Sequence, residues 1–286
     1  LKKAKSLGIK TILLSGTPED NYIYDIVNEE NKKIGSTEID AYTYDRRNRY
    51  FNQSMKYLDI AVGFFPNVYK TYAESKTFKG KSLQLAGHIT PDFPHFDLSD
   101  KKPSSGKFTV GFLSYTVVLK GLQYLLEAWE NIMAEPGREN MQLIIGGPVN
   151  PVMKSYISKH YAEVKNVTYT GQVNDIPAFM QDLDLFVVPS LIDGGPLTAL
   201  EAAHYAVPVL ITDNSGSCVL VSKGDGGGYV IPIRDAEAIK EKILWAYNHK
   251  EQNAQFGLNA KQNLDNYSFE EYIVRLSDYL QTELND

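Results

Sequence analysis

Short apolar runs separated by segments of helix length recur along the whole chain. In the second half, the runs that predict strands lie at residues 108–114, 141–145, 167–170, 183–188, 208–212 and 229–233. Uninterrupted runs of this kind are typical of strands covered on both faces of a parallel sheet. Helices are predicted where apolar residues recur at helical spacing, as from Leu122 to Met133, and at 235–247. The pattern predicts a doubly wound parallel sheet built from six strand-helix units.

The first hundred or so residues alternate in the same way. Strands are predicted at 9–14, 59–65 and 82–86, and helices at 1–7, at 22–30, in a segment that ends near Tyr57 and at 67–73. This alternation indicates another parallel sheet with helices on its faces. Residues 87–94 break the pattern, and the polar segment 97–107 follows them, so a domain boundary is expected here. We therefore predict a first domain at 1–106, a second at 107–267, and a closing segment, 268–286, that contains a helix at 269–284.

Composition narrows the class of protein. With 286 residues, 43% of them hydrophobic, the chain is long enough for one large domain or two modest ones with real cores. No apolar run reaches about 18 residues and no signal-peptide core opens the chain, so a cytoplasmic protein without a membrane span is expected. The formal charge of −6 argues against broad binding to nucleic acid. The single cysteine, Cys218, rules out an internal disulfide and fits a reducing compartment.

The stretch from Pro189 to Glu201 is the strongest candidate for chemistry, because it joins a predicted buried strand to a helix through a glycine turn. Gly194 and Gly195 let the main chain turn tightly and approach a ligand closely. Pro196 fits the first helical turn, which leaves the N–H groups of Leu197 and Thr198 free. A helix that begins with open N–H groups is suited to holding phosphate or another anion.

Two carboxylates flank this predicted anion site. Glu201 lies one turn beyond Leu197, within reach of hydroxyl groups attached to a bound anion. Asp193 lies in the turn and is placed to bind hydroxyls from the other end. A phosphate-binding helix start between two carboxylates that bind hydroxyls matches the parts of a nucleotide-sugar: ribose, diphosphate and hexose. The alternative is an ordinary strand-to-helix turn in which Asp193 is a cap and Glu201 a surface charge.

Ligands of doubly wound sheets bind at the carboxyl ends of the strands, and three further loops at that edge carry glycine or polar residues. They are Ser114–Gly121, Gly146-Gly147-Pro148 and 171–174. Other features are assigned structural roles: His88 lies in a connecting segment, Cys218 is an idle thiol, and the Tyr- and Arg-rich stretch 42–50 is a solvated face, with binding as the alternative. Asp182 and Asp184 form a DxD pattern, but it precedes a strand and points away from the ligand edge, so no metal site is predicted.

The ordered motifs of residues 108–265 resemble the donor-binding domain of a GT-B glycosyltransferase, most closely glycosyltransferase family 4, the retaining group 1 enzymes. The motifs that carry the resemblance are Lys120-Gly121, Gly146-Gly147-Pro148, Gly171-Gln172-Val173, Pro189-Ser190, Asp193 to Thr198, and Glu201-Ala202. The resemblance implies an α/β fold of GT-B type with two Rossmann-like domains and parallel sheets. Residues 1–106 resemble only the later part of the N-terminal domain, so this domain is expected to be incomplete, and the helix at 269–284 is expected to cross back to it.

The resemblance also implies roles for residues. Glu201 would hold the ribose hydroxyls, Asp193 a hexose hydroxyl, and Lys120 would neutralise the leaving phosphates, with no metal and no cofactor. The remaining donor-binding residues would be Ser114, Tyr115, Gly146, Gly147, Pro148, Gly171, Gln172, Val173, Gly194, Gly195, Pro196, Leu197 and Thr198. The sequence departs from the family in two of these places: Tyr115 stands in the region where an arginine is usual, and Asp193 replaces a glutamate.

The function implied is a glycosyltransferase of polysaccharide biosynthesis that moves a hexose, with retention, from a UDP- or GDP-sugar to a glycan or lipid-linked acceptor. Peripheral contact with a membrane stays open, because many relatives use lipid-linked acceptors. One alternative is a donor-binding accessory or degenerate transferase, favoured by Tyr115 and by the incomplete first domain. Another is a different GT-B enzyme, such as a nucleotide-sugar epimerase or a phosphorylase. The base, the sugar and the acceptor are not readable from the sequence.

Overall fold

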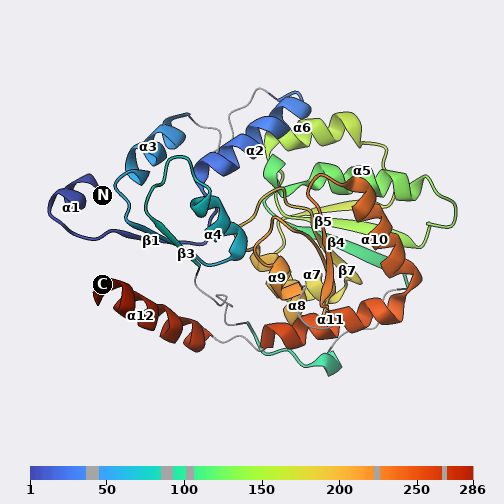
Figure 1. Ribbon diagram of the computed structural model, residues 1–286. Coiled ribbons are helices and arrows are strands. Elements are labelled where there is room, and N and C mark those ends of the chain that lie inside the picture. Colours follow the sequence, from blue (N-terminus) through green and yellow to red (C-terminus); the bar gives the residue numbers. More distant parts are fainter. Residues whose placement is uncertain (37–44, 85–92, 101–105, 222–225, 266–268, 286) are drawn as a thin grey trace. The chain divides into compact units, whose positions relative to one another are not determined.

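The computed structural model describes residues 1–36, 45–84, 93–100, 106–221, 226–265 and 269–285 (Figure 1). By their internal contacts the residues form two compact units. The first comprises Leu1–Pro91, Ile192–Gly195 and Tyr267–Asp286, and the second Asp92–Leu191 and Pro196–Asn266. Each unit is an α/β layer structure around its own parallel sheet, as the alternating pattern predicts. The domain limits drawn from the sequence stay a prediction.

The second unit is built on a six-stranded sheet of order β6-β5-β4-β7-β8-β9, in which neighbouring strands are parallel. This is the doubly wound order, so the predicted sheet is confirmed. Its strands are β4 (Phe108–Leu113), β5 (Met141–Gly146), β6 (Val167–Gly171), β7 (Leu185–Val188), β8 (Val209–Thr212) and β9 (Gly228–Ile231). The strand order reverses between β4 and β7, and the loops that follow these two strands lie at the edge where ligands of such sheets bind.

Helices cover both faces of this sheet (Figure 1). They are α5 (Leu122–Met133), α6 (Pro151–His160), α7 (Ile176–Gln181), α8 (Leu197–His204), α9 (Cys218–Val221), α10 (Ala236–Asn248) and α11 (Lys250–Asp265), with 3-10 turns η1 (Leu98–Asp100) and η2 (Val118–Lys120). Helices α5 and α10 pack together, and α8 packs with α11. The sequence pattern did not single out α11, because its polar residues leave only a narrow apolar stripe, at Gly257, Ala260 and Leu264.

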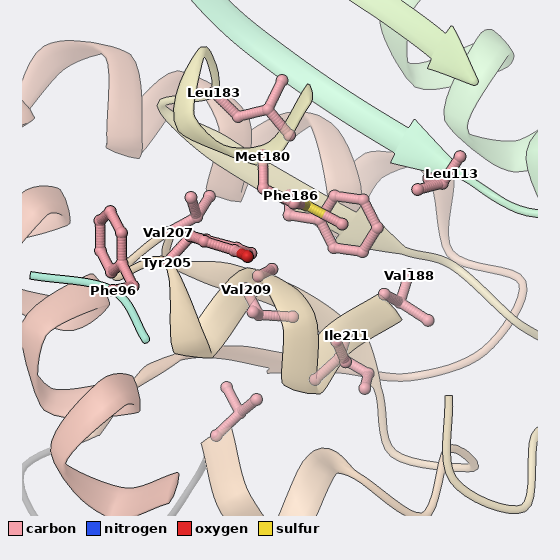
Figure 2. Packing of buried hydrophobic residues seen from close by; sticks show 13 residues of the cluster. Phe96, Leu113, Met180, Leu183, Phe186, Val188, Tyr205, Val207, Val209 and Ile211 are labelled. Carbon is pink, nitrogen blue, oxygen red and sulfur yellow. The ribbon is translucent and has the colours of Figure 1, made fainter. Parts of the chain in front are cut away.

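The core under α7 and α8 follows from side-chain alternation along β7 and β8. Phe186 and Val188 point to the same face as Val209 and Ile211, and Figure 2 shows these side chains packed with Met180 and Leu183. Phe96 and Tyr205 close the cluster, with their ring centroids 4.9 Å apart. This core holds α7 and α8 against the strands that end at the candidate site.

The first unit contains a three-stranded parallel sheet of order β1-β2-β3, formed by Ile12–Ser15, Ile60–Gly63 and Lys81–Gln84. Its helices are α1 (Lys2–Ser6), α2 (Asp20–Lys33), α3 (Asp45–Met55), α4 (Pro66–Ala73) and α12 (Phe269–Asn285). One apolar cluster joins Met55 with Val68 and Tyr72. Another joins Ile60 and Val62 of β2 with Leu276 and Tyr279 of α12, so the closing helix packs on this sheet.

Some predicted boundaries were wrong by a few residues. Strand β1 begins at Ile12 and not at Ile9, which is 55% exposed, and β7 begins at Leu185 and not at Leu183. Leu183 packs in the core beside the strand, where its side chain fills the space that Gly111 leaves free. An apolar run therefore marks burial, while the main-chain ladder decides where the strand starts.

The two aspartates of the DxD pattern have a structural explanation. Asp182 ends α7, and Asp184 Oδ2 accepts a hydrogen bond of 2.7 Å from the Thr109 main-chain N–H, so it ties the entry of β7 to β4. We expect Asp184→Asn to lower the free energy of unfolding by about 1.5–3 kcal/mol, because a charged acceptor is lost. Asp182→Asn, an exposed neighbour in the same turn, is the control and should change little. Urea denaturation measures both, and equal effects would contradict this role.

Candidate functional site

Three loops at the carboxyl edge of the second unit's sheet are tied to one another by main-chain hydrogen bonds. The Ser114 N–H donates to the Gly146 carbonyl at 3.2 Å, and the Gly147 N–H donates to the Gly171 carbonyl at 2.7 Å. The Thr116 N–H donates to the Pro148 carbonyl at 2.9 Å. The structure therefore brings together the ends of β4, β5 and β6, as the sequence predicts for Ser114, Gly146 and Gly171.

Glycine is required at two positions of this edge. Gly147 has φ +96°, and a Cβ atom there would lie 2.0 Å from the Ser114 carbonyl oxygen. A Cβ atom on Gly146 would lie 2.8 Å from both Leu113 Cδ1 and Val173 Cγ2. Side chains at these positions would push the first two loops apart, so the Gly-Gly pair sets how closely the loops approach.

The side chains around these loops differ in what they offer a ligand. Tyr115 is 57% exposed, and Pro148 and Gln172 are also exposed. Val173 packs against the apolar cluster near Phe179, so only its main chain is available. Sequence reasoning missed Thr116, which is fully buried with an Oγ1 atom that finds no hydrogen-bond partner in the described structure. No local pattern marks this residue, because its burial comes from the meeting of two loops.

The loop that carries Lys120 is held against the loop that follows β7. Lys120 ends the 3-10 turn η2 and is partly buried, and the Leu191 N–H donates to the neighbouring Leu119 carbonyl at 2.8 Å. Gly121 has φ +71°, and a Cβ atom there would lie 1.9 Å from the Pro189 carbonyl oxygen. Lys120 is therefore positioned by a close main-chain contact between the loops that follow β4 and β7, the strands at which the sheet order reverses.

Helix α8 begins at this edge with an open N-terminus. Its N-cap is Pro196, one residue before the helix, so the prediction that Pro196 lies inside the first turn was wrong by one position. Pro196 has no side chain that caps the helix, and in the described structure no acceptor takes a hydrogen bond from the N–H groups of Leu197 or Thr198. Leu197 is 55% exposed and does not belong to the core face of α8. The open N–H groups can receive an anion.

Glu201 lies on α8 one turn after these N–H groups. Its side chain is partly buried, and burial alone raises the pKa of its carboxyl above the ordinary value. The described residues provide neither a hydrogen-bond donor nor a cation to this carboxylate. A partly buried carboxylate without a partner is costly unless a ligand supplies hydrogen bonds, so Glu201 is a candidate binding residue.

Three side chains at the end of β8 and in the loop after it hold the main chain at Ser190, Leu191 and Pro196. Thr212 Oγ1 donates to the Ser190 carbonyl at 2.5 Å, Asn214 Nδ2 to the Leu191 carbonyl at 2.7 Å, and Ser217 Oγ to the Pro196 carbonyl at 3.3 Å. Sequence reasoning missed all three as supporting residues. The only signal was their clustering after a strand end, since hydrogen bonds between loops have no sequence period.

The remaining turn residues, Asp193, Gly194 and Gly195, belong to the first unit by their contacts. Asn67 Nδ2 donates to the Asp193 carbonyl at 2.7 Å, and the Gly195 N–H donates to Asp193 Oδ1 at 3.3 Å. A Cβ atom on Gly194 would lie 1.7 Å from the Gly16 carbonyl oxygen. Both glycines are thus required for close packing in that unit, and Asp193 shapes the turn with its own side chain.

Two further sequence assignments can be located. His88 lies outside the described residues, and nothing is assigned to it. Cys218 begins α9, and burial raises the pKa of its thiol to about 11, so it is mostly protonated at neutral pH. Within the described ranges, no cluster of three or more His, Cys, Asp and Glu side chains is arranged to hold a metal ion. In the same ranges, no helix has both the length and the apolar character that a bilayer crossing requires.

Comparison with known proteins identifies the family that matches this chain. Residues 96–263, more than half of the chain, match the family described as glycosyl transferases group 1. This range contains every loop of the carboxyl edge described above. The motifs at Lys120, Gly146 and Glu201 therefore lie where the family match lies, in agreement with the resemblance found from the sequence.

Individual relatives are distant. The chain is 25% identical over 197 residues to the capsular polysaccharide biosynthesis glycosyltransferase CapM of Staphylococcus aureus, covering 68% of this chain and 50% of CapM. It is 27% identical over 175 residues to N,N'-diacetylbacillosaminyl-diphospho-undecaprenol alpha-1,3-N-acetylgalactosaminyltransferase of Campylobacter jejuni, covering 61% of this chain and 43% of that protein. The chain thus spans about half the length of these curated relatives.

Solved structures support the fold. The crystal structure of Anabaena Alr3699/HepE in complex with UDP and glucose superimposes with a TM-score of 0.66 at 16% sequence identity, covering 98% of this chain and 76% of that one. At this identity the similarity establishes the fold alone. The α/β fold with parallel sheets is accordingly of the GT-B type, as the sequence predicts.

Proposed function

We propose, since the chain belongs to the group 1 glycosyl transferases, that it transfers a hexose from a nucleoside-diphosphate sugar to a glycan or lipid-linked acceptor. The observation that carries this proposal is the arrangement on α8, where the open N–H groups of Leu197 and Thr198 stand one turn before the unpartnered carboxylate of Glu201. The first pair suits a diphosphate and the carboxylate suits the ribose hydroxyls. The same helix can then hold both parts of a nucleotide.

The chemistry that these residues would assist is the departure of a nucleoside diphosphate. The bond from the sugar anomeric carbon to a phosphate oxygen breaks, and negative charge grows on the phosphates. Fixed positive groups stabilise such charge without rearranging. Lys120 and the N-terminus of α8 would supply them, because both belong to the edge where β4 and β7 end. We include in the proposal that neither a metal ion nor a cofactor takes part.

Retention of configuration is a further part of the proposal. A bond would form from the anomeric carbon to the acceptor oxygen on the face from which the phosphate leaves, and the acceptor proton would pass to the leaving phosphate. Asp193 would bind a hexose hydroxyl. These roles rest on the family resemblance of the motifs and on the unpartnered Glu201, and kinetic and product analysis must test them.

Two features bear on the substrates. Tyr115 stands at the exposed edge where the family usually has an arginine, and the loss of one such charge typically costs about 2.7–4 kcal/mol of transition-state stabilisation. One phosphate contact to the donor would therefore be missing, or another group would replace it. The names of the relatives point to capsular polysaccharide and to a diphospho-undecaprenol acceptor, and HepE was crystallised with UDP and glucose. These names support a UDP-sugar as the first donor to test.

The test is a thermal-stability panel with UDP, GDP and ADP and their hexose conjugates. A ligand at about 100 times its dissociation constant should stabilise the fold by about 2.7 kcal/mol, which is easily seen as a higher melting temperature. We expect one nucleotide to raise the melting temperature and Glu201→Ala to abolish that rise. The next experiment would measure product formation with a lipid-linked acceptor.

A different result would favour the accessory or degenerate transferase. If none of the nucleotides shifts the melting temperature, the donor site is not functional in this chain. If a nucleotide binds and Glu201→Ala binds it equally well, the ribose role of Glu201 is wrong. An epimerase would convert one UDP-sugar to another without any acceptor, so analysis of the donor after incubation separates that activity from transfer.

A further inference from the structure

The turn that carries Asp193 is held by residues of the first unit. By their contacts Ile192–Gly195 group with that unit, while the chain up to Leu191, and again from Pro196, groups with the second. The first unit therefore sets the shape of this turn. The function proposed above assigns the turn a contact with the hexose, so the residues that hold it bear on how the sugar is bound.

Asn67, in the first turn of α4, makes the hydrogen bond that ties this turn down. Its Nδ2 atom donates to the Asp193 carbonyl oxygen at 2.7 Å. The oxygen of the same amide, Oδ1, accepts from the Val68 N–H at 2.9 Å. Since the amide oxygen is directed to a main-chain donor of its own helix, the N–H groups of Asn67 are directed to the other side. The orientation that serves Asp193 is thus set by α4 itself.

Helix α4 is a firmly packed base for this asparagine. Val68, the next residue, is fully buried and belongs to an apolar cluster with Phe65. A Cβ atom on Gly63, the last residue of β2, would lie 2.5 Å from the Tyr69 main-chain nitrogen, so α4 lies directly against the end of that strand. The first turn of α4 therefore has little room to shift, and Asn67 is held where it meets the Asp193 carbonyl.

The other residues of the turn are seated on the same unit. A Cβ atom on Gly194 would collide with the Gly16 carbonyl oxygen, and one on Gly195 would lie 2.2 Å from Cε2 of the Phe65 ring. The Gly195 N–H donates to Asp193 Oδ1 at 3.3 Å. The direction of the Asp193 carboxylate therefore depends on the main chain of the turn, which the amide on α4 and these two close contacts fix.

We propose that Asn67 is a positioning residue of the donor site, which holds the turn so that the Asp193 carboxylate meets a hexose hydroxyl. This inference rests on the function proposed above. Asn67 acts through Asp193 and not by touching the substrate, as a supporting residue does in a preorganised site. The groups assigned to the nucleotide lie on α8, in the second unit. Loss of Asn67 should therefore weaken the binding of the sugar and spare that of the nucleotide.

The test compares two dissociation constants of the whole chain by isothermal titration calorimetry. The ligands are UDP and whichever of UDP-glucose, UDP-galactose and UDP-N-acetylglucosamine binds most tightly. We expect Asn67→Ala to leave the UDP value within about twofold and to raise the UDP-sugar value about tenfold, because a hydrogen bond to a charged acceptor is weakened. Asn67→Asp keeps an acceptor for the Val68 N–H but has no N–H for the Asp193 carbonyl, so it should show the same split.

Thr71→Val is the matched control on the same helix. Thr71 is 5% exposed, and its Oγ1 atom donates to the Val68 carbonyl at 2.8 Å and accepts from the Glu19 N–H at 3.0 Å. The substitution loosens α4 and leaves the bond from Asn67 to the turn in place. It should lower the melting temperature of the protein, while the ratio of the two dissociation constants stays within about twofold of the unmodified value.

A double-mutant cycle shows whether Asn67 acts through Asp193. Asp193→Ala alone should also raise the UDP-sugar dissociation constant about tenfold. Once that carboxylate is gone, adding Asn67→Ala should change the constant by less than about twofold, because nothing is left to position. Two effects that multiply in full would show that the residues act independently, and would overturn the proposal.

Amide exchange of Gly195, followed by NMR without any ligand, separates this proposal from the proposed function. Exchange should be several-fold faster in Asn67→Ala and unchanged in Thr71→Val, because the bond of Gly195 to Asp193 loses its support only in the first. An unchanged rate in Asn67→Ala would overturn the role of Asn67 alone. So would equal losses of UDP and UDP-sugar, a UDP-sugar affinity kept in Asn67→Asp, or the same split in Thr71→Val. No binding of UDP to the unmodified chain would overturn the proposed function, and this inference with it.

Discussion

Glu201→Gln is expected to raise the melting temperature of the free protein and, in the same variant, to weaken nucleoside-diphosphate binding by roughly 10- to 100-fold. The two effects have one cause. Burial raises the pKa of the Glu201 carboxyl, so the ionised form is disfavoured in the folded state and lowers stability at neutral pH. Glutamine keeps the shape and removes the charge, but as a neutral acceptor it binds ribose hydroxyls more weakly.

The effect of Glu201→Gln on stability should depend on pH, in a direction that can be checked. A carboxyl whose folded pKa lies above its unfolded value favours folding below the unfolded value of 4.5, and that contribution is lost as pH rises through the folded value. The stability gain of Glu201→Gln should therefore be present at pH 7 and vanish near pH 4. Thermal melts at both values measure it. Glu127→Gln, at an exposed glutamate of α5, is the control, and a gain that is the same at both pH values would refute the explanation.

Gly121→Ala should lower the free energy of unfolding by about 2–5 kcal/mol and abolish nucleotide binding. The left-handed conformation at φ +71° costs a residue with a Cβ atom about 1–2 kcal/mol. The new methyl group would also lie 1.9 Å from the Pro189 carbonyl oxygen, and relieving an overpacked contact typically costs about 1–3 kcal/mol more. The only relief is to move the loop of Lys120 away from the turn after β7, which separates the two parts of the predicted phosphate site.

Gly137→Ala, outside the predicted site, is a matched control for this prediction. Gly137 has nearly the same conformation, φ +76°, and no atom lies within 4 Å of the position its Cβ would take. It should therefore lose only the conformational part, about 1–2 kcal/mol, and still bind nucleotide. Urea denaturation of both variants with and without nucleotide separates the two contributions. Equal losses would show that the contact with Pro189 is relieved without cost.

Local patterns predicted much of the fold of the second unit. The apolar runs marked all six strands of its sheet, because a strand buried on both faces needs a continuous apolar stretch. The alternation of strands and helices then required parallel pairing, since each crossover returns the chain to the same edge. The glycines at 121, 146 and 147 could also be picked out in the sequence. Only glycine, which has no Cβ atom, lets main chains approach each other so closely.

Contacts between distant segments could not be predicted in this way. Thr212, Asn214 and Ser217 support the turn before α8 across separations of about twenty residues, and hydrogen bonds of this kind impose no period on the sequence. The hydrogen bond from Asn21 Nδ2 to Asn52 Oδ1, which joins α2 to α3, likewise has no sequence signature.

The sequence by itself determined the order of the strands, the parallel α/β class, and the placing of Lys120, Gly146 and the start of the Glu201 helix in segments that follow strands, since burial and glycine geometry act on neighbouring residues. Only the tertiary structure decided which polar groups find partners. It leaves the carboxylate of Glu201 without a partner and pairs Arg47 with Asp20. Whether a polar group binds a ligand depends on whether the fold has already satisfied it, and that is a property of the packed chain.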